Sequence, residues 1–291
     1  MILSMFGDLM RKNQVYISVD VEEWFHSNWF DISKVIDTNF SGKFPKTDVE
    51  LTTKKLIETF EEYDVKGTFF VLGETAYKYP KIIEILEESN HEIACHSYYH
   101  NKKFNDLDEF SKDIKKYKKE IKSDLTGFRF PNFGYSNEKF EILLEHGFKY
   151  DSSIVPCLNI PGWYGNPKSP MKPYKLTLED GKHINEFPIS VLPYLRFPGA
   201  GGWYIRNFGY YWTKTLIKLS LKKSGYAMVY IHPWEISNEN PNLKDIPFHV
   251  FRNTGDKTLN NLKLLIESFP DADFLTIHEG IKKWKRKAKY L

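Results

Sequence analysis

The sequence of 291 residues predicts an α/β protein with a mainly parallel sheet. The first observation is a set of short apolar runs, such as GTFFVL at 67–72, which are typical of strands buried on both faces. The second is that segments with apolar residues at helical spacing, such as 79–89, stand between these runs. The third is an apolar content of 41%, which is enough for a sizeable core.

The expected elements alternate along the chain. Strands are expected, in order, at 15–19, 67–72, 91–96, 127–130, 148–155, 184–190, 227–235 and 273–277. Helices are expected at 48–63, 79–89, 106–121, 137–147, 209–223 and 258–269. The motif TDVE marks the start of the helix at 48–63, and an aspartate stands near the start of the amphipathic helix at 106–121. The Gly- and Pro-rich region 156–207 is the least regular and is expected to cover one face of the core.

Composition limits the classes of partner. Two cysteines cannot form a metal box and do not suggest a disulfide framework. Positive charges are spread along the chain until a basic tail at 281–291, so no nucleic-acid partner is expected; the tail suits a solvated helix or a peripheral contact with anionic lipid. No apolar run reaches membrane-spanning length, and the lead 1–14 lacks the order of a secretory signal, so a cytoplasmic location is expected.

Aromatic residues are unusually dense in three short segments. Aromatic content is 16%, and EEWFHSNWF, PGWYG and GGWYIRNFGYYW hold more aromatic rings than a core needs. The last segment includes Trp203 and Tyr204. These rings suit stacking on sugars, but packing in the core or in loops explains them equally well.

Polar side chains recur where the expected strands end. These are Asp20, Glu22, His96, His100, Arg129, Asp151 and His232. Each alone has an ordinary structural explanation, such as a core histidine, a capping carboxylate or a surface ion pair. In a parallel α/β barrel the strand ends share one rim, so residues far apart in sequence converge there. Their recurrence therefore favours a catalytic site, whereas the other histidines lack this arrangement: His26, His91, His146, His183, His249 and His278.

His96 and His100 are expected to bind a divalent metal. Their spacing places both imidazoles on one side of a helical turn. Two imidazoles and a carboxylate leave coordination positions open for water. A lone pair of histidines at this spacing is more often structural, but the acids at another strand end favour a metal site.

The motifs resemble those of the polysaccharide deacetylases with the NodB homology domain, carbohydrate esterase family 4. SVDVEEW, HSYYH, RFPNFG, YDSS and YIHPWE are similar, in order, to the five family motifs. HEIACHSYYH, NEFPIS and GAGGWYIR are also similar to the subfamily of exopolysaccharide and exosortase loci, which has a C-terminal extension, here about 236–280. The resemblance covers about 15–280, which we expect to form one catalytic domain.

The resemblance implies a distorted (β/α)7-type barrel and metal-dependent hydrolysis of an N-acetyl, sometimes O-acetyl, group on a sugar. It implies Asp20 as general base, held anionic by Arg129, and His232 as general acid oriented by Asp151. Zinc would be the metal, with cobalt, nickel or manganese possible. Backbone amides near Asn132 and Phe133 would hold the oxyanion, and Trp203, Tyr204 and Trp234 would contact substrate. Departures are the D-x-E-E spacing of the first motif and Asn132, where the family usually has Tyr.

Strand periodicity favours Glu22 over Glu23 as the third metal ligand. In ISVDVEE, Asp20 and Glu22 share one face of the strand, and Val19, Val21 and Glu23 share the other. This holds only if the strand continues past Val21.

Two other functions stay open. One is hydrolysis of a non-polymeric amide or of a lipid- or nucleotide-linked sugar by a related enzyme. The other is carbohydrate binding by a relative that has lost catalysis. A missing base or acid would favour that function, but both Asp20 and His232 are present. The sequence does not define the sugar, the linkage or the oligomeric state.

Overall fold

The computed structural model describes residues 13–27, 29–100, 106–121 and 125–288. Most of the expected lead at 1–14 and the end of the expected tail at 281–291 therefore lie outside the described residues. No helix in the described ranges is long and apolar enough to cross a membrane.

The described strands form one large, mainly parallel sheet and one small hairpin. The large sheet has the order β10-β1-β2-β3-β4-β5-β7-β6, with β11 pairing with β1. All its pairs are parallel except β6 with β7. The strands are β1 (Gln14–Val21), β2 (Gly67–Val71), β3 (Glu92–Cys95), β4 (Gly127–Phe128), β5 (Tyr150–Asp151), β6 (Tyr174–Thr177), β7 (His183–Glu186), β10 (Tyr226–Ile231) and β11 (Asp273–Phe274). The hairpin pairs β8 (Val191–Leu192) with β9 (Phe197–Pro198).

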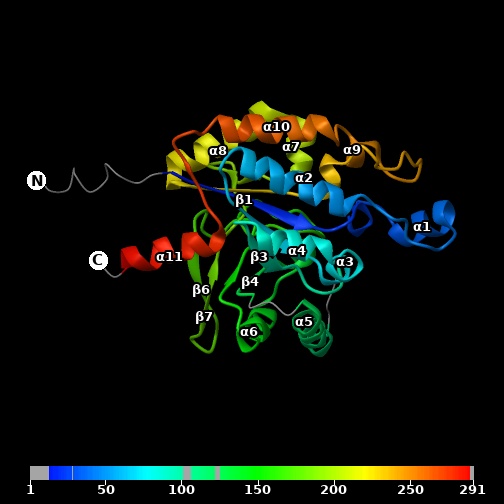
Figure 1. Cartoon of the computed structure of the whole chain (residues 1–291). Helices are drawn as coiled ribbons and strands as arrows, with labels where there is room; N and C mark the ends of the chain where they lie inside the picture. Colours follow the sequence, from blue (N-terminus) through cyan, green and yellow to red (C-terminus); the bar gives the residue numbers. More distant parts are fainter. Residues whose placement is uncertain (1–12, 28, 101–105, 122–124, 289–291) are drawn as a thin grey trace, which may run out of the picture.

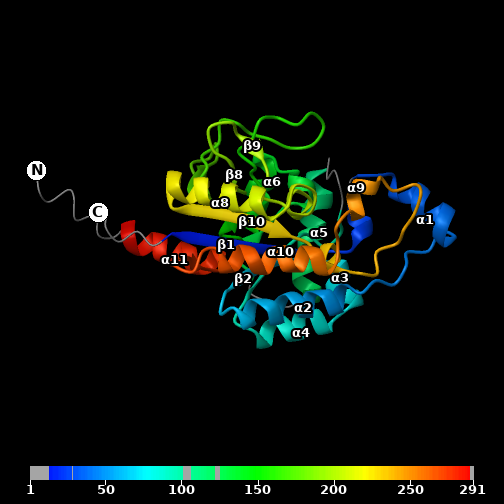
Figure 2. The same ribbon diagram turned by 90° about the horizontal axis from the view of Figure 1, so that it is seen from above.

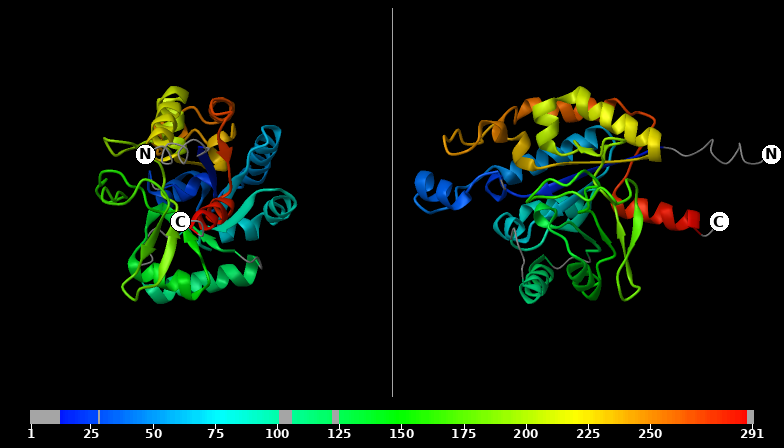
Figure 3. Two further views of the ribbon diagram at one scale, coloured as in Figure 1. Left: turned by 90° about the vertical axis from the view of Figure 1, so that its left-hand side faces the viewer. Right: turned by 180° about the vertical axis from the view of Figure 1, so that it is seen from behind.

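Helices pack around the outside of this sheet (Figures 1 and 3). They are α1 (Ile32–Phe40), α2 (Val49–Glu62), α3 (Gly73–Lys78), α4 (Lys81–Glu88), α5 (Leu107–Ile121), α6 (Asn137–Glu145), α7 (Gly202–Phe208), α8 (Tyr210–Ser224), α9 (Phe248–Phe251), α10 (Asp256–Glu267) and α11 (Ile277–Ala288). Three short 3-10 helices are η1 (Trp24–His26), η2 (Pro131–Phe133) and η3 (Pro233–Ile236). The expected α/β class with a parallel sheet is thus confirmed.

The sheet curls into a half-barrel that an irregular segment helps to close. The expected strand at 184–190 ends at Glu186, because Pro188 has no N–H to give to a ladder. The chain then crosses to β10, where the Ser190 N–H donates to the Met228 carbonyl and the Tyr230 N–H donates to the Ala200 carbonyl. The distorted barrel expected from the sequence is therefore closed by loop hydrogen bonds.

The central strand β1 explains why the strands are apolar throughout. It pairs with β10 on one side and β2 on the other, and residues Val15 to Val21 are all buried. Helices lie along both sides of β1 and β10. In Figure 2, α10 and α2 lie on one side of β1 and β10, and α8 with the β8–β9 hairpin lies on the other.

Sequence periodicity missed several short elements. The helix expected at 209–223 is α8, but the helix α7 just before it was not expected; Gly209, whose φ of 80° lies in the left-handed region, separates the two. Helix α3 has six residues, too few to show a helical period. The alternating exposure of β6 reflects its position at the edge of the sheet.

Candidate metal and catalytic site

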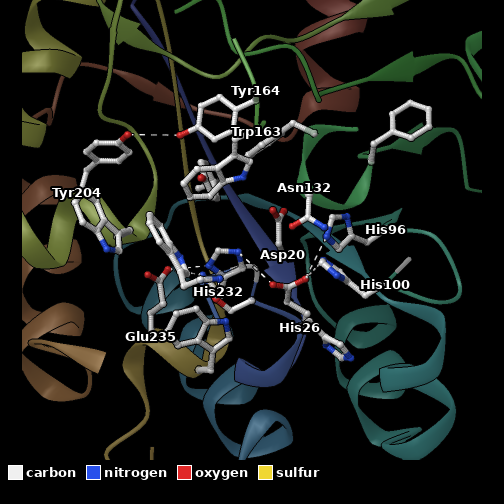
Figure 4. Close-up of a pocket in the computed structure, with 18 of the residues that line it drawn as sticks. Asp20, His26, His96, His100, Asn132, Trp163, Tyr164, Tyr204, His232 and Glu235 are labelled. Atoms are coloured by element: carbon white, nitrogen blue, oxygen red, sulfur yellow. Dashed lines mark hydrogen bonds and ion pairs between the residues drawn. The ribbon is translucent and has the colours of Figure 1, made fainter. Parts of the chain in front are cut away.

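A pocket of about 700 Å³ opens at the carboxyl ends of the parallel strands (Figure 4). It collects residues from almost the whole length of the chain. Its polar lining includes Asp20, Glu22, His26, His96, His100, Asn132, His232 and Glu235. Its aromatic lining includes Trp29, Trp163, Tyr164, Trp203, Tyr204 and Trp234. The strand-end residues expected to converge do so, with Arg129 and Asp151 buried beneath the pocket rather than lining it.

Glu22, His96 and His100 form a candidate metal site. One ligand atom from each lies within 4.8 Å of the others. The Glu22 Oε2 atom lies 2.8 Å from His100 Nε2 and 3.5 Å from His96 Nε2. His96 Nδ1 lies 2.8 Å from the Arg129 carbonyl oxygen, which can only accept, so Nδ1 carries the proton. The lone pair of His96 Nε2 therefore faces Glu22, which is the tautomer that a metal ligand needs.

The side chains of Glu22, His96 and His100 are better suited to bind a divalent cation than to hydrogen-bond to one another. Glu22 is buried, and its Oε2 atom has no well-aligned hydrogen bond among the described residues, despite its short distance to His100. Burial acts to raise the pKa of Glu22, but the charge of His100 and the close approach of both histidine rings hold it well below its usual range. Burial lowers the pKa of His100. Carboxylate and neutral imidazole are the forms that bind divalent metals.

The two histidines are held by a loop and not by the expected helical turn. Ser97 has a left-handed φ of 71°, which breaks any helix between His96 and His100. The buried Asp113 carboxylate of α5 accepts hydrogen bonds from Ser97 Oγ at 2.5 Å, the Tyr98 N–H at 2.8 Å and the Tyr99 N–H at 2.8 Å. His96 and His100 do lie close together, as their spacing predicted, but the predicted helical turn was wrong. Sequence reasoning missed Asp113, which looks like an ordinary polar residue of an amphipathic helix.

The two glutamates of the first motif point to different surroundings. Strand β1 ends at Val21, and the Glu22 N–H donates back to the Asp20 carbonyl at 3.0 Å, so strand periodicity does not apply to either residue. Glu22 nevertheless faces the histidines. Glu23 Oε1 accepts from Lys78 Nζ at 2.9 Å and from Thr47 Oγ1 at 3.0 Å, which places it in a separate ion pair.

Arg129 holds Asp20 from below. Its Nη1 atom donates to Asp20 Oδ1 at 2.6 Å and to Ser18 Oγ at 2.8 Å. Its Nε atom donates to the Ser152 carbonyl at 2.8 Å, and its Nη2 donates to Ser152 Oγ at 2.7 Å. Arg129 is fully buried, so this charge-assisted pair fixes the position of the Asp20 carboxylate. A fixed carboxylate beside the candidate metal site can accept a proton from water.

His232 is oriented by Glu235 and not by Asp151, which corrects the expectation from the sequence. Glu235 Oε2 lies 3.0 Å from His232 Nδ1 and accepts the His232 backbone N–H at 3.0 Å. Arg206, from α7, donates to Glu235 Oε1 at 2.7 Å. The other ring nitrogen, His232 Nε2, lies 3.5 Å from Glu22 Oε1 and so faces the candidate metal site.

The charge on His232 follows from these partners. Burial alone would lower the pKa of His232, but the hydrogen bond to Glu235 and the negative charges of Glu235, Glu22 and Asp20 raise it to about 9. Burial acts to raise the pKa of Glu235, but Arg206 and His232 hold it below its usual range. An imidazolium paired with a carboxylate can donate a proton from Nε2 into the pocket.

Asp151 supports the site indirectly. Its carboxylate accepts from the Ser153 N–H at 2.8 Å and from Ser153 Oγ at 2.9 Å. Ser153 Oγ in turn accepts the Phe130 N–H at 2.8 Å. Burial raises the pKa of Asp151 to about 6, and burial together with the Asp151 charge raises that of Glu186 well above its usual range. The YDSS motif thus positions the Arg129 segment, with two buried carboxyl groups side by side.

The expected oxyanion donors are only partly available. Asn132 and Phe133 have left-handed φ angles of 56° and 58°, which turn the chain sharply at the pocket wall. The Phe133 N–H already donates to the Phe130 carbonyl at 3.0 Å, so the expectation for this amide is corrected. The backbone N–H of Asn132 is the remaining candidate. The Asn132 side-chain nitrogen is also buried without a partner in the described part of the chain.

Three expected aromatic residues line the pocket, together with others that sequence reasoning did not single out. Trp234 stacks on His232 with ring centroids 5.4 Å apart, and Trp203 and Tyr204 come from α7. Trp29 stacks on Trp203 at 5.4 Å and meets Trp163 edge-on at 4.5 Å. The dense aromatic segments of the sequence therefore meet at one wall of the pocket. His26, set aside as structural or solvated, also lines the pocket and stacks on His100 at 5.3 Å.

Two protein families match segments of this chain. Residues 42–150 match the polysaccharide deacetylase family, and residues 152–281 match a domain of unknown function, DUF3473. The first segment holds His96, His100 and Arg129, and the second holds His232 and Glu235. Both segments contribute strands to the same sheet.

Similar known proteins include two deacetylases. A peptidoglycan deacetylase of Helicobacter pylori is 28% identical over 111 residues, 36% of this chain and 38% of that protein. A peptidoglycan-N-acetylglucosamine deacetylase of Bacillus cereus is 37% identical over 70 residues, 21% of this chain and 26% of that protein. The matched segments thus span well under half of either relative.

The fold is also similar to that of a putative polysaccharide deacetylase from Mycobacterium smegmatis. The TM-score is 0.67 at 18% identity, covering 96% of this chain and 93% of the other. The two proteins therefore share an α/β fold with a curled parallel sheet that forms a half-barrel. The family match and the two relatives support a polysaccharide deacetylase domain, of the NodB type, within this chain.

Proposed function

We propose that the protein is a metal-dependent hydrolase that removes N-acetyl groups from an amino sugar in a polysaccharide, an oligosaccharide or its lipid- or nucleotide-linked precursor. One observation carries the proposal: a Glu-His-His cluster lies in one pocket between a buried, arginine-paired Asp20 and a carboxylate-paired His232. Together these groups can supply a metal site, a base and an acid for hydrolysis of an unactivated amide. A role in exopolysaccharide biosynthesis and a cytoplasmic location remain predictions from the sequence.

Glu22, His96 and His100 would hold the metal, for which zinc suits the ligand set. When bound, such an ion polarises a carbonyl group and lowers the pKa of water. Asp20 would accept the proton of the attacking water, and the hydrogen bond from Arg129 holds the Asp20 carboxylate in place for that step. The Asn132 N–H would donate to the oxyanion that develops on the acetyl group.

His232 would complete the reaction as general acid. Its Nε2 atom faces the pocket, while Nδ1 is held by Glu235. Donation of the Nε2 proton to the leaving nitrogen allows the C–N bond to break and releases a free amine and acetate. Arg206 balances the charge of Glu235 throughout, so the imidazole keeps its orientation.

Acetate release tests this proposal directly. The purified protein is incubated with N-acetylglucosamine oligomers and with peptidoglycan fragments, with and without a chelator. We expect acetate release that the chelator abolishes and added zinc, cobalt, nickel or manganese restores. Binding of these glycans without acetate release from any of them, in the presence of each metal, would instead support a carbohydrate-binding protein.

A further inference from the structure

A second surface of the molecule is unusually apolar and lies beside the pocket. The tip of the β8–β9 hairpin exposes Tyr194 and Leu195, which are 76% and 67% exposed. We call this surface the hairpin face; its exposed large apolar side chains are Leu158, Tyr194, Leu195, Phe197, Phe208 and Tyr211. Figure 2 shows the hairpin standing out beside α8.

Contacts connect several parts of the hairpin face. The Leu158 N–H donates to the Arg196 carbonyl at 2.9 Å, which fixes Leu158 beside the hairpin. Phe197 and Phe208 each pack against the Trp212 ring, with centroids 5.9 Å and 5.4 Å apart. Exposed apolar side chains from a loop, the hairpin and α7 are therefore gathered here and not scattered singly.

The segment that forms most of the hairpin face carries charge of one sign. No Asp or Glu occurs between Phe187 and Trp234, a segment that includes the hairpin, α7 and α8. Exposed Lys218 and Lys222 lie on the same side of α8 as Tyr211, and the Lys223 ammonium lies 4.6 Å from the centre of the Tyr194 ring. In a chain with 41 basic and 38 acidic residues, this is a marked local excess of positive charge.

We propose that the hairpin face docks on a membrane surface that contains anionic lipid. An apolar loop tip with tyrosines, bordered by lysines, matches the boundary between acyl chains and anionic headgroups. Leu195 would enter the acyl region, and the tyrosine rings would lie at the headgroup level. The absence of acidic residues from this segment removes the repulsion that an anionic surface would otherwise meet.

Docking would bring the pocket close to the bilayer. Phe208, on the hairpin face, packs against Trp203 and Tyr204 of the pocket wall, with ring centroids 5.7 Å and 5.8 Å apart. An aromatic path therefore connects the docking surface with the candidate site. Membrane docking itself does not depend on the proposed reaction.

Vesicle sedimentation tests the proposal with the full chain. Vesicles of phosphatidylcholine alone are compared with vesicles that contain about a third phosphatidylglycerol. We expect binding to the anionic vesicles to be at least fivefold stronger and to fall as salt is added. The double variant Lys218→Glu, Lys222→Glu should weaken this binding by about twentyfold or more, since each lysine near an anionic surface contributes roughly fivefold.

The double variant Tyr194→Ser, Leu195→Ser should also lose most binding. The matched control is Leu51→Ser, Tyr77→Ser, which removes side chains that are 65% and 71% exposed on α2 and α3. It should bind like wild type, and all variants should keep the wild-type melting temperature because the changed residues are exposed. Equal binding to both vesicle types, no binding, or wild-type binding by the hairpin variant overturns the proposal. A dimer that the hairpin variant converts to monomer assigns the face to a second copy and also overturns it.

Discussion

Replacing Glu235 by Gln should shift the pH range in which the enzyme turns over. Gln keeps the shape of Glu but removes the charge that offsets the burial of His232. With the hydrogen bond and charge of Glu235 present, the pKa of His232 is raised to about 9. Without them, burial should return this pKa to its ordinary value of about 6.5 or below. Only the protonated imidazole can donate to the leaving nitrogen.

The size of the effect follows from these two values. At pH 8 the protonated fraction of His232 should fall from about 0.9 to about 0.03, which lowers turnover about thirtyfold. The alkaline limb of the pH profile should move toward lower pH. A bound cation lowers the pKa in both proteins, so the comparison is made with the same metal.

The stability of the protein should change in the same pH window. The pKa of His232 is raised on folding, so its contribution to stability is fully present below about pH 6.5. This contribution is lost as pH rises through about 9. In Glu235→Gln that pH dependence should shrink. The variant also leaves the buried Arg206 guanidinium without its carboxylate, which should cost about 3–5 kcal/mol.

Acetate release from pH 5 to 10 and urea unfolding at pH 6 and 9.5 measure both effects. Asp151→Asn is the control, because Asp151 bonds to Ser153 and not to His232. It should leave the alkaline limb where it is in wild type. If the limb stays in place in Glu235→Gln but moves in Asp151→Asn, the assignment of Glu235 is refuted and the sequence-based one is restored.

Three further changes test the rest of the site. Glu22→Ala should lose bound metal in equilibrium dialysis, whereas Glu23→Ala should retain it because Glu23 pairs with Lys78; the opposite result would reverse the ligand assignment. Asp20→Asn should retain metal but lower the rate of acetate release by about two to four decades, and near-normal turnover would mean another base. Asp113→Ala should cost about 2–4 kcal/mol in urea unfolding and weaken metal binding by about 10–100-fold, since it frees the histidine loop; unchanged metal affinity would show that the loop holds its shape alone.

The sequence predicted the fold class well because the alternation of apolar strands and amphipathic helices is repeated along the chain. Buried strands and helices alternate several times, so no single boundary decides the class. Boundaries were less predictable: the strand expected at 184–190 ended early at Pro188, and the helix at 209–223 proved to be the second of a pair. Such limits depend on single residues with special backbone properties, here Pro188 and Gly209.

Convergence of the site was predictable, but its internal contacts were not. Asp20 lies near the end of β1, His96 and His232 directly follow β3 and β10, and parallel strands bring their ends together. The partner of His232 was missed because sequence order does not reveal which acid reaches Nδ1. Glu235 does so from three residues away, where η3 turns its carboxylate back toward His232. Arg206 was also missed. It lies on α7, within the Gly-rich region that was expected to be irregular, and the path of that region depends on packing that leaves no periodic pattern in the sequence.

Arg129 makes the base and one candidate metal ligand parts of a single unit. Its side chain holds Asp20, and its carbonyl oxygen accepts the His96 Nδ1 proton at 2.8 Å. Its N–H donates to Cys95 in β3, so residue 129 is fixed from three directions. The spacing between Asp20 and the candidate metal site is therefore set in the barrel floor and not by the aromatic wall above. In the proposed reaction, changes in the loops of that wall would alter which glycans bind without moving Asp20 relative to His96.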